Sequence, residues 1–471
     1  MKGEALYHGR SIKVVLISPY ELGRQPFGLA EPAAWLRARG FEVICIDLSQ
    51  SSLEDHVIED AGLIAIHLAM HTATRIAVEA LPRIRALAPR AYLCVYGLYA
   101  PVNEAYFTSL GVRGVLGGEF EADLLELATR VREDDLPEVF HRSRVEKLAF
   151  RVPDREHLPP LEQYAQLLGA GPEPLTLGFA EGSRGCKHLC RHCPVVPVYQ
   201  GRFRIVPVDV VLADIAQQVA AGAQHISFGD PDFLNGPTHA LRLVRALHAQ
   251  HPNVTYDATI KVEHLLKHRS VLPELAATGC RFVTSAVESI DDDVLAKLEK
   301  NHTCADFEEA VRLMREAGIA LAPTFVAFHP WSTLDGYLGL LNKLIELDLI
   351  ESVPAIQLSI RLLVPQGSRL LTLPGFDQLI GRFDPKLLGY PWVHADPRVD
   401  ALHRTVQAAA ELGEQNSWTR TETFTQIWEA THKALGLDAS PIAPPTSAPP
   451  PHHSEPWYCC AEPTQQQLQS F

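Results

Sequence analysis

Three closely spaced cysteines are the residues of this sequence whose types and spacing point most directly to chemistry. Three residues separate Cys186 from Cys190, and two separate Cys190 from Cys193. Cysteine thiolates bind iron–sulfur clusters and zinc, and a [4Fe–4S] cluster bound by three cysteines keeps one iron open to a further ligand. We therefore predict a cluster with an open iron on this loop. A zinc site with His188 or His192 as fourth ligand is the alternative.

The residues around the cysteines suit a loop that holds an anionic cluster. The apolar segment 174–180 is expected to be the strand that delivers the loop. Gly182 and Gly185 relax the backbone, while Arg184 and Lys187 place positive charge beside the thiolates. These features favour the cluster over zinc.

The cysteine loop resembles the cluster loop of the radical S-adenosylmethionine (SAM) superfamily. The similarity includes Arg184 and the glycine before Cys186, and the C-x-x-C-P pattern that ends at Pro194. The resemblance implies that the three cysteines bind a [4Fe–4S] cluster whose open iron chelates the methionine moiety of SAM.

Two later segments resemble SAM-binding segments of the same superfamily. For the first, the resemblance implies that Gly229 and Asp230 receive the SAM amino group; a turn into the next helix is the alternative. For the second, a V-E-S…L…K segment, it implies that Glu288 and Ser289 bind SAM, with the Glu288 carboxylate on the ribose hydroxyls. A helix cap or an ion pair with the following helix is the alternative role of Glu288.

Short apolar runs alternate with helical patterns in the N-terminal part, as in a doubly wound sheet. Ser18-Pro19 and the G-G-E-F-E run that begins at Gly117 resemble the cobalamin-binding domain that precedes many radical SAM domains. The Asp-x-His-x-x-Gly loop, which would supply a cobalt-binding histidine, is absent after the first expected strand. The resemblance implies either cobalamin bound without a histidine ligand or a domain that has lost the corrinoid. His67 and His71 are expected to be structural.

We expect an α/β protein with a Rossmann-like first domain and a partial (β/α)6 TIM-type barrel, followed by a helical C-terminal region with a disordered tail. The predicted parts are 10–140 for the cobalamin-binding-like domain, 141–173 for a connector, 174–372 for the radical SAM barrel, 373–438 for the helical region and 439–471 for the proline-rich tail.

The tail ends its proline-rich run with two adjacent cysteines, Cys459 and Cys460. Prolines favour an extended tether without helix or sheet. The ending Cys-Cys-Ala-Glu-Pro resembles that of the CUAEP/CCAEP-tail radical SAM proteins, in which the second cysteine position can be selenocysteine. The resemblance implies a redox role for Cys459 and Cys460, and an ordinary tail without a duty is the alternative.

Composition limits the class of protein. The chain has 471 residues, 46% hydrophobic and 21% charged, which is ordinary for a globular protein. A net charge of −14 argues against nucleic acid as a partner. No apolar run resembles a signal or a membrane span, and nine cysteines with three clustered fit a reducing compartment. We expect a cytoplasmic protein without a membrane partner.

The resemblance implies an enzyme that cleaves SAM reductively to modify an unknown small molecule or peptide. Methyl transfer is expected with corrinoid, and rearrangement or sulfur or selenium chemistry without it. The expected electron donor is a reductant such as flavodoxin or ferredoxin. A non-catalytic sensor or scaffold that holds a metal or cluster is the alternative class.

Overall fold

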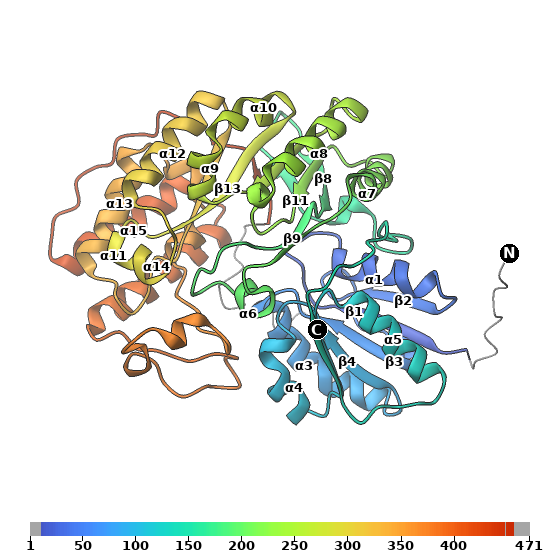
Figure 1. Ribbon diagram of the computed structural model, residues 1–471. Helices are drawn as coiled ribbons and strands as arrows, with labels where there is room; N and C mark the ends of the chain where they lie inside the picture. The colour runs from blue at the N-terminus through green and yellow to red at the C-terminus, as the bar shows by residue number, and fades with distance from the viewer. Residues whose placement is uncertain (1–10, 448, 456–471) are drawn as a thin grey trace. The chain divides into compact units, whose positions relative to one another are not determined.

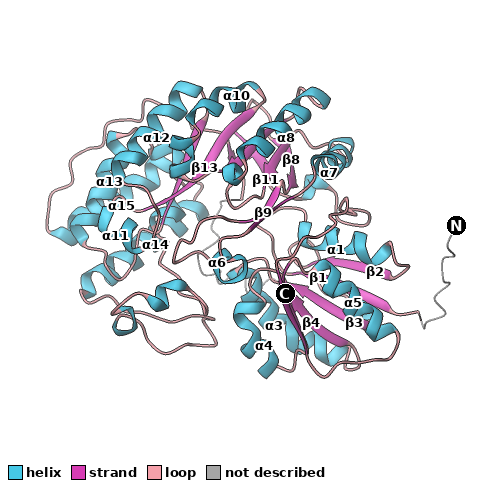
Figure 2. Cartoon of the chain, in the orientation of Figure 1, coloured by secondary structure: helices cyan, strands magenta, loops and turns pink. Residues whose placement is uncertain are grey.

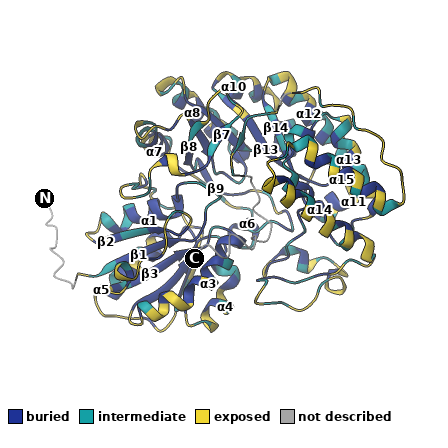
Figure 3. Ribbon diagram, turned by 180° about the vertical axis from the view of Figure 1, so that it is seen from behind, coloured by how far each residue is buried: buried dark blue, intermediate teal, exposed yellow. Residues whose placement is uncertain are grey.

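The computed structural model describes residues 11–447 and 449–455. The chain forms two compact units that divide between Pro160 and Leu161. Each unit contains its own sheet, and the strands of both are largely buried (Figures 1 and 3). Cys459 and Cys460 lie outside the described residues.

The first unit is a six-stranded sheet in which every neighbouring pair of strands is parallel, in the order β2-β1-β3-β4-β5-β6. Its strands are β1 (Lys13–Ser18), β2 (Glu42–Asp47), β3 (Ala61–His67), β4 (Tyr92–Tyr96), β5 (Gly114–Gly118) and β6 (Phe140–Arg144). Its helices are α1 (Phe27–Arg37), α2 (Asp55–Ile58), α3 (His71–Leu87), α4 (Glu104–Ser109) and α5 (Glu121–Arg132). The expected doubly wound sheet is confirmed.

The apolar runs predicted as strands are buried on both faces of this sheet. Val14, Leu16, Leu63 and Leu116 are completely buried and pack in one cluster with residues of α1 and α5. Continuous apolar runs are typical of parallel strands, because helices cover both faces of the sheet. The strands and the helices α1 and α5 together therefore supply this core.

The second unit is built on a seven-stranded sheet in the order β14-β13-β12-β11-β8-β7-β15. Within this sheet, β8, β11, β12, β13 and β14 run parallel, whereas β7 is antiparallel to β8 and β15 is antiparallel to β7. The strands are β7 (Gln166–Leu168), β8 (Leu175–Ala180), β11 (His225–Phe228), β12 (Thr255–Thr259), β13 (Cys280–Glu288), β14 (Ala320–Phe325) and β15 (His452–His453). A separate antiparallel ribbon joins β9 (Ser183–Gly185) to β10 (Phe203–Ile205). The sheet curls into a half barrel, which confirms the expected fold class.

Helices follow most of the parallel strands of the second unit and lie along its sheet (Figure 2). They are α6 (Val195–Tyr199), α7 (Val208–Ala220), α8 (Pro237–Gln250), α9 (Val262–Lys267), α10 (Leu272–Ala277), α11 (Asp292–Lys297), α12 (Cys304–Ala317), α13 (Leu334–Glu346), α14 (Pro397–Gln415) and α15 (Arg420–Leu435). α15 packs against both α13 and α14, so the helical region after the barrel covers the last helix of the barrel.

Three local features differ from the sequence expectations. The expected (β/α)6 barrel requires a sixth strand, but the segment 355–361 forms only one parallel bridge, between Phe328 and Arg361. A 3-10 helix over Ala355–Leu358 takes up most of that segment, and the Gln357 side chain accepts a hydrogen bond from the Phe325 amide. The expected connector contains the strands β6 and β7.

The third difference concerns the proline-rich segment, which was expected to form neither helix nor sheet. It contributes β15, and the Ser454 amide donates to the Gln166 carbonyl at 2.8 Å. Proline fixes an extended backbone, and residues 452–455 between the prolines keep the amides that an edge strand needs. Among the described residues, no helix has the length and apolarity needed to cross a membrane.

Candidate functional site: the cysteine loop of the second unit

The cysteine loop follows β8 and is held by the β9–β10 ribbon. Gly185 pairs with Phe203 in this ribbon at a φ of +71°. A Cβ at Gly185 would lie 2.4 Å from Tyr199 and 2.5 Å from the Arg202 carbonyl oxygen. Only glycine fits such a close approach at positive φ. The surroundings therefore require glycine at the position before Cys186.

The three cysteines lie in one small region. Cys186 and Cys190 are buried and Cys193 is half-buried. The Cys193 amide donates to the Cys190 carbonyl at 3.2 Å, which closes a tight turn between the last two thiols. Burial raises the pKa of Cys186 to about 11, the His188 amide lowers it, and Cys190 is close enough to interact with it electrostatically. Buried thiols with such a pKa need a cation nearby to become thiolate ligands.

Asn235 holds the start of the loop. Its Oδ1 accepts a hydrogen bond from the Lys187 amide at 3.2 Å and lies 3.9 Å from Cys186 Sγ. Asn235 is completely buried in the turn before α8. Nothing in the sequence distinguishes this asparagine from an ordinary turn residue, and the sequence analysis did not find it.

Asp230 holds the backbone before the cysteine loop through hydrogen bonds. Its Oδ2 accepts the Gly182 amide at 2.8 Å, and its Oδ1 accepts the Ser183 hydroxyl at 2.5 Å. Burial raises the pKa of Asp230 to about 7, although the hydrogen bonds from Ser183 and Gly182 lower it. Both oxygens of the carboxylate expected to receive the SAM amino group are thus bonded to the loop.

Gly229, the other residue expected at the SAM amino group, lies against Phe179. A Cβ on Gly229 would stand 2.1 Å from the Phe179 ring. The packing of β8 against β11 therefore explains this glycine without a ligand.

Glu288 ends β13 in a conformation that residues with a side chain rarely adopt. Its φ is +71°, and the register of β13 with β14 shifts between Ala286 and Glu288. Non-glycine residues at positive φ cluster at functional sites, where the surrounding contacts hold them in place. The bulge aims the carboxylate at two basic side chains.

These two basic partners are His192 and Lys300. His192 Nε2 lies 3.0 Å, and Lys300 Nζ 3.3 Å, from Glu288 Oε1. Burial raises the pKa of Glu288, but Lys300 and His192 outweigh it and lower the pKa to about 2. Lys300 also interacts electrostatically with Cys190 and Cys193, so a buried cation lies beside the loop.

Ser289 lies next to Glu288 and is also buried. Its hydroxyl accepts a hydrogen bond from the Asp291 amide at 3.0 Å, just before α11. In the structure Ser289 thus stabilises the turn into α11.

The histidines of the loop separate the two metal hypotheses. His192 is engaged by Glu288. Cys186, His188 and Asp232 offer donor atoms that lie within 4.8 Å of one another, which is the ligand set a zinc site would use. Among the described residues, this group contains neither Cys190 nor Cys193. A zinc site on the group would leave two of the three cysteines without a role.

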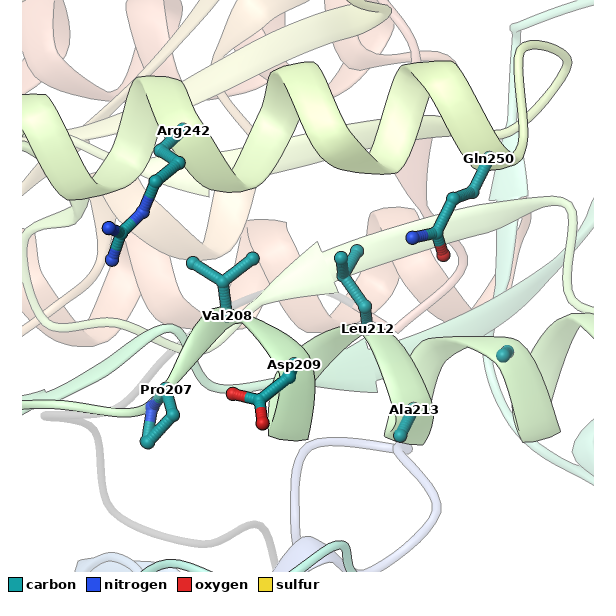
Figure 4. A pocket seen from close by; sticks show the side chains of 8 residues that line it. Pro207, Val208, Asp209, Leu212, Ala213, Arg242 and Gln250 are labelled. Carbon is teal, nitrogen blue, oxygen red and sulfur yellow. The ribbon is translucent and has the colours of Figure 1, made fainter.

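The donor set fits the cluster hypothesis better. Three thiols lie on one loop, a buried lysine lies near two of them, and the backbone of the loop is fixed by Asp230 and Asn235. A shallow hollow of about 670 Å³ between α7 and α8 contains none of these residues (Figure 4). Its lining is Pro207, Val208, Asp209, Leu212, Ala213, Ala216, Arg242 and Gln250.

In the first unit, His67 lies at the carboxyl end of β3, the edge where ligands of doubly wound sheets bind. Its Nδ1 lies 2.8 Å from Glu21 Oε1, and its ring fills the space that a Cβ on Gly28 or Gly97 would occupy. Glu21 also accepts the amides of Phe27 and Gly28 through Oε2. His67 is therefore packed as a structural residue, as expected.

The comparisons with known proteins agree with this geometry. Residues 181–332 match the sequence model of the radical SAM superfamily. The matched segment contains the cysteine loop, so this part of the chain is similar to the radical SAM superfamily.

Two solved structures are similar over both units. The cobalamin-dependent SAM radical enzyme OxsB, with aqua-cobalamin and SAM bound, has a TM-score of 0.63 and 15% identity, covering 86% of this chain and 67% of that chain. The radical SAM methyltransferase TsrM from Kitasatospora setae, with cobalamin and a [4Fe–4S] cluster bound, has a TM-score of 0.56 and 20% identity. The match covers 72% of this chain and 70% of that chain. At this identity the likeness establishes the fold.

Two curated relatives are similar over less than half of this chain. The tRNA-2-methylthio-N(6)-dimethylallyladenosine synthase of Pasteurella multocida (strain Pm70) is 27% identical over 214 residues, 40% of this chain and 42% of the relative. The bacteriochlorophyllide d C-12(1)-methyltransferase of Chlorobaculum tepidum is 25% identical over 227 residues, which are 46% of this chain and 47% of the relative. The chain thus spans less than half of these two relatives.

Proposed function

We propose that this chain is an enzyme that cleaves SAM reductively at a [4Fe–4S] cluster held by Cys186, Cys190 and Cys193. The observation that carries the proposal is the presence of three thiols on one fixed loop within a radical SAM domain. When bound, the cluster supplies an electron to SAM and an open iron that chelates it. Residues of the chain stabilise the thiolates and position SAM.

Lys300 and Glu288 tune the region around the thiols. The buried Lys300 cation offsets negative charge on Cys190 and Cys193, which stabilises the thiolate form that a cluster needs. Both basic partners of Glu288 contact Oε1. We assign Glu288 Oε2 to the ribose hydroxyls of SAM, since a carboxylate oxygen accepts hydroxyl donors well.

Asp230 and Gly229 support the loop in this proposal. Asp230 positions the backbone of Gly182 and Ser183, and Gly229 lets β11 pack closely on Phe179. Residues 229–233 would then receive the SAM amino group, through backbone carbonyls as well as through the acidic segment. Ser289 fixes the turn that orients Glu288.

The first unit directs the outcome of the reaction. Its fold is that of a cobalamin-binding-like domain, and its first loop supplies the carboxylate of Glu21, which His67 and two amides already engage. This loop, residues 19–26, contains no histidine, so a corrinoid here would bind without a protein imidazole from it. We propose methyl transfer when a corrinoid is present. A corrinoid absorption spectrum after anaerobic purification with hydroxocobalamin tests this step, and an absent spectrum contradicts it.

The substrate we propose is a small molecule or a peptide. The relative from Pasteurella multocida acts on tRNA by its name, whereas the net charge of −14 of this chain opposes a polyanion. A reductant such as flavodoxin or ferredoxin would deliver the electron.

The function is tested by anaerobic reconstitution with iron and sulfide, followed by an assay of 5′-deoxyadenosine with SAM and dithionite. Cys186→Ala, Cys190→Ala and Cys193→Ala should each abolish product and lower the iron content. Cys304→Ala is the matched control, because Cys304 lies on α12 and interacts with Glu308. Continued product formation in the Cys186 variant would contradict the proposal.

A non-catalytic metal-binding protein is the competing function. The group Cys186, His188 and Asp232 is the observation that favours it. Zinc without iron in the anaerobically purified protein, together with no SAM cleavage, would establish this function in place of the enzyme.

A further inference from the structure

Three metal-binding side chains meet inside the second unit, away from the cysteine loop. His225 begins β11, Asp257 lies in the middle of β12, and His453 ends β15. His225 and Asp257 are buried, and the His453 side chain is only 11% exposed. The donor atoms of all three lie within 4.8 Å of one another.

The geometry converges on one carboxylate oxygen. His225 Nε2 lies 3.0 Å and His453 Nε2 2.9 Å from Asp257 Oδ1. Ligand atoms about 2 Å from a tetrahedral zinc ion stand roughly 3.3 Å from one another. The observed separations are therefore close to those of a metal site, and only small side-chain shifts are needed to admit the ion.

The surroundings orient the three side chains as the outer residues of a metal site do. Thr255 Oγ1 lies 2.7 Å from His225 Nδ1, which fixes the ring so that Nε2 faces Asp257. Ser227 donates its hydroxyl to Asp257 Oδ2 at 3.2 Å. A partner on the second ring nitrogen of a ligating histidine is the usual arrangement in metal sites. Phe282 stacks on the His225 ring and contacts the His453 ring edge to face.

The third ligand comes from the proline-rich segment. His453 is 196 positions from Asp257 in the chain, and it reaches β12 from the far edge of the sheet because the sheet curls. The same segment is fixed at other points. Trp428 donates its indole N–H to the Ser440 carbonyl at 3.0 Å, and Ser447 donates its hydroxyl to Asp348 at 2.6 Å. Residues 440–447 and 449–455 are thus held at several points, the last of them at the three side chains.

Charge favours a divalent cation at this position. With neutral imidazoles the group carries one negative charge in a buried environment, which the hydrogen bonds from His225, Ser227 and His453 stabilise without supplying a positive charge. Two imidazoles and one carboxylate are a ligand set for divalent transition metals, with a fourth position left for a water or hydroxyl.

We propose that His225, Asp257 and His453 bind a zinc ion that fastens the C-terminal segment to the half barrel. This site is independent of the cysteine loop and of the proposed function. It places the attachment point six residues before Cys459 in the sequence.

The test uses the full chain with its cysteine loop filled by anaerobic cluster reconstitution, then stripped of loosely bound metal with a chelator. Zn²⁺ is titrated by calorimetry, and zinc and iron are counted after desalting. The unaltered chain should bind one equivalent of zinc more than His453→Gln, and the affinity of this site should fall at least about 100-fold in that variant. Asp257→Asn should show the same loss.

His452→Gln is the matched control for His453→Gln. It changes the neighbouring residue of the same strand, whose Nδ1 contacts the Pro450 carbonyl oxygen. This variant should keep the full zinc content. Because both substitutions lie in a two-residue edge strand, they leave the parallel barrel strands intact.

A second measurement follows the segment itself. Added Zn²⁺ should slow proteolytic cleavage within 440–455 by about tenfold or more in the unaltered chain and in His452→Gln, but not in His453→Gln. Equal zinc content in the unaltered chain and His453→Gln would overturn the proposal and leave a hydrogen-bonded anchor without metal. Since iron content and SAM cleavage are measured separately, failure of the proposed function is distinguishable from failure of this site.

Discussion

Lys300 Nζ lies 3.3 Å from Glu288 Oε1, and both side chains are buried beside the cysteine loop. The pair joins the end of β13 to the residue that follows α11 by three positions. Breaking a buried ion pair by removing one partner costs about 3–5 kcal/mol, because the other charge is left without compensation. The loop therefore depends on a pair that contains none of its own residues.

We expect Lys300→Met to destabilise the second unit by about 3–5 kcal/mol and to reduce SAM cleavage. The reason is that the Glu288 carboxylate would remain buried next to the thiols with only His192 as partner. Urea unfolding gives the stability, and 5′-deoxyadenosine formation gives the activity. Lys297→Met is the control, since its ammonium contacts the exposed Asp293 carbonyl. If Lys300→Met and Lys297→Met lost equal stability and equal SAM cleavage, the role of Lys300 as the buried partner of Glu288 would be contradicted.

Asp230 should make stability depend on pH. Its pKa is 3.8 ordinarily and about 7 in the folded protein, because burial raises it. The folded state thus binds a proton that the unfolded chain releases between these pH values. The resulting stability is complete below pH 3.8 and falls as pH rises to about 7, by about 4 kcal/mol at most.

The variant Asp230→Asn isolates this effect, because asparagine can accept the Gly182 amide and donate to Ser183 without titrating. The unaltered protein should lose stability as the pH rises from about 5 to about 8, whereas Asp230→Asn should lose less. Urea unfolding at both pH values measures this difference. An unchanged KM for SAM would agree with loop support. A KM that rises tenfold or more would instead assign the Asp230 carboxylate to the SAM amino group.

The sequence predicts the scaffold of the site better than its contacts. The strand before Cys186, the parallel strands of both units and the helix after Glu288 follow from apolar runs and turn residues. These patterns are local, and burial in a parallel sheet enforces them. Cysteine spacing is also local, which is why the loop was identifiable.

The contacts across the fold were not predictable in the same way. His192 meets Glu288 across 96 positions, and His453 meets Asp257 across 196. Neither pair leaves a periodic pattern, and Asp257 reads as an ordinary polar residue in a strand. The sixth strand was wrongly predicted for a related reason, since apolar residues around Ile356 fit a 3-10 turn as well as a strand.

For the tail cysteines, we expect Cys459→Ser with Cys460→Ser to leave 5′-deoxyadenosine formation within about twofold of the unaltered protein. The reason is that the cysteine loop already has the three thiols that the cluster needs, and the tail cysteines come many residues after the barrel in the sequence. Turnover of the natural substrate should be lost if these thiols carry the redox step. The measurement is the ratio of SAM cleaved to substrate modified. A parallel loss of SAM cleavage would contradict a role confined to the tail.

Gly185 offers a test of the loop that leaves all three thiols in place. Gly185→Ala puts a methyl group at positive φ and within 2.5 Å of Tyr199 and the Arg202 carbonyl oxygen, so the β9–β10 ribbon must shift. A strained conformation of this kind costs about 1–3 kcal/mol. Because Cys186 is the next residue, we expect iron content and SAM cleavage to fall several-fold while the far-UV circular dichroism spectrum is retained. Gly171→Ala is the control, since a Cβ there meets no atom within 4 Å. Full iron content in Gly185→Ala would mean that the thiols reach the cluster without the fixed backbone, and the preorganised loop would lose its role.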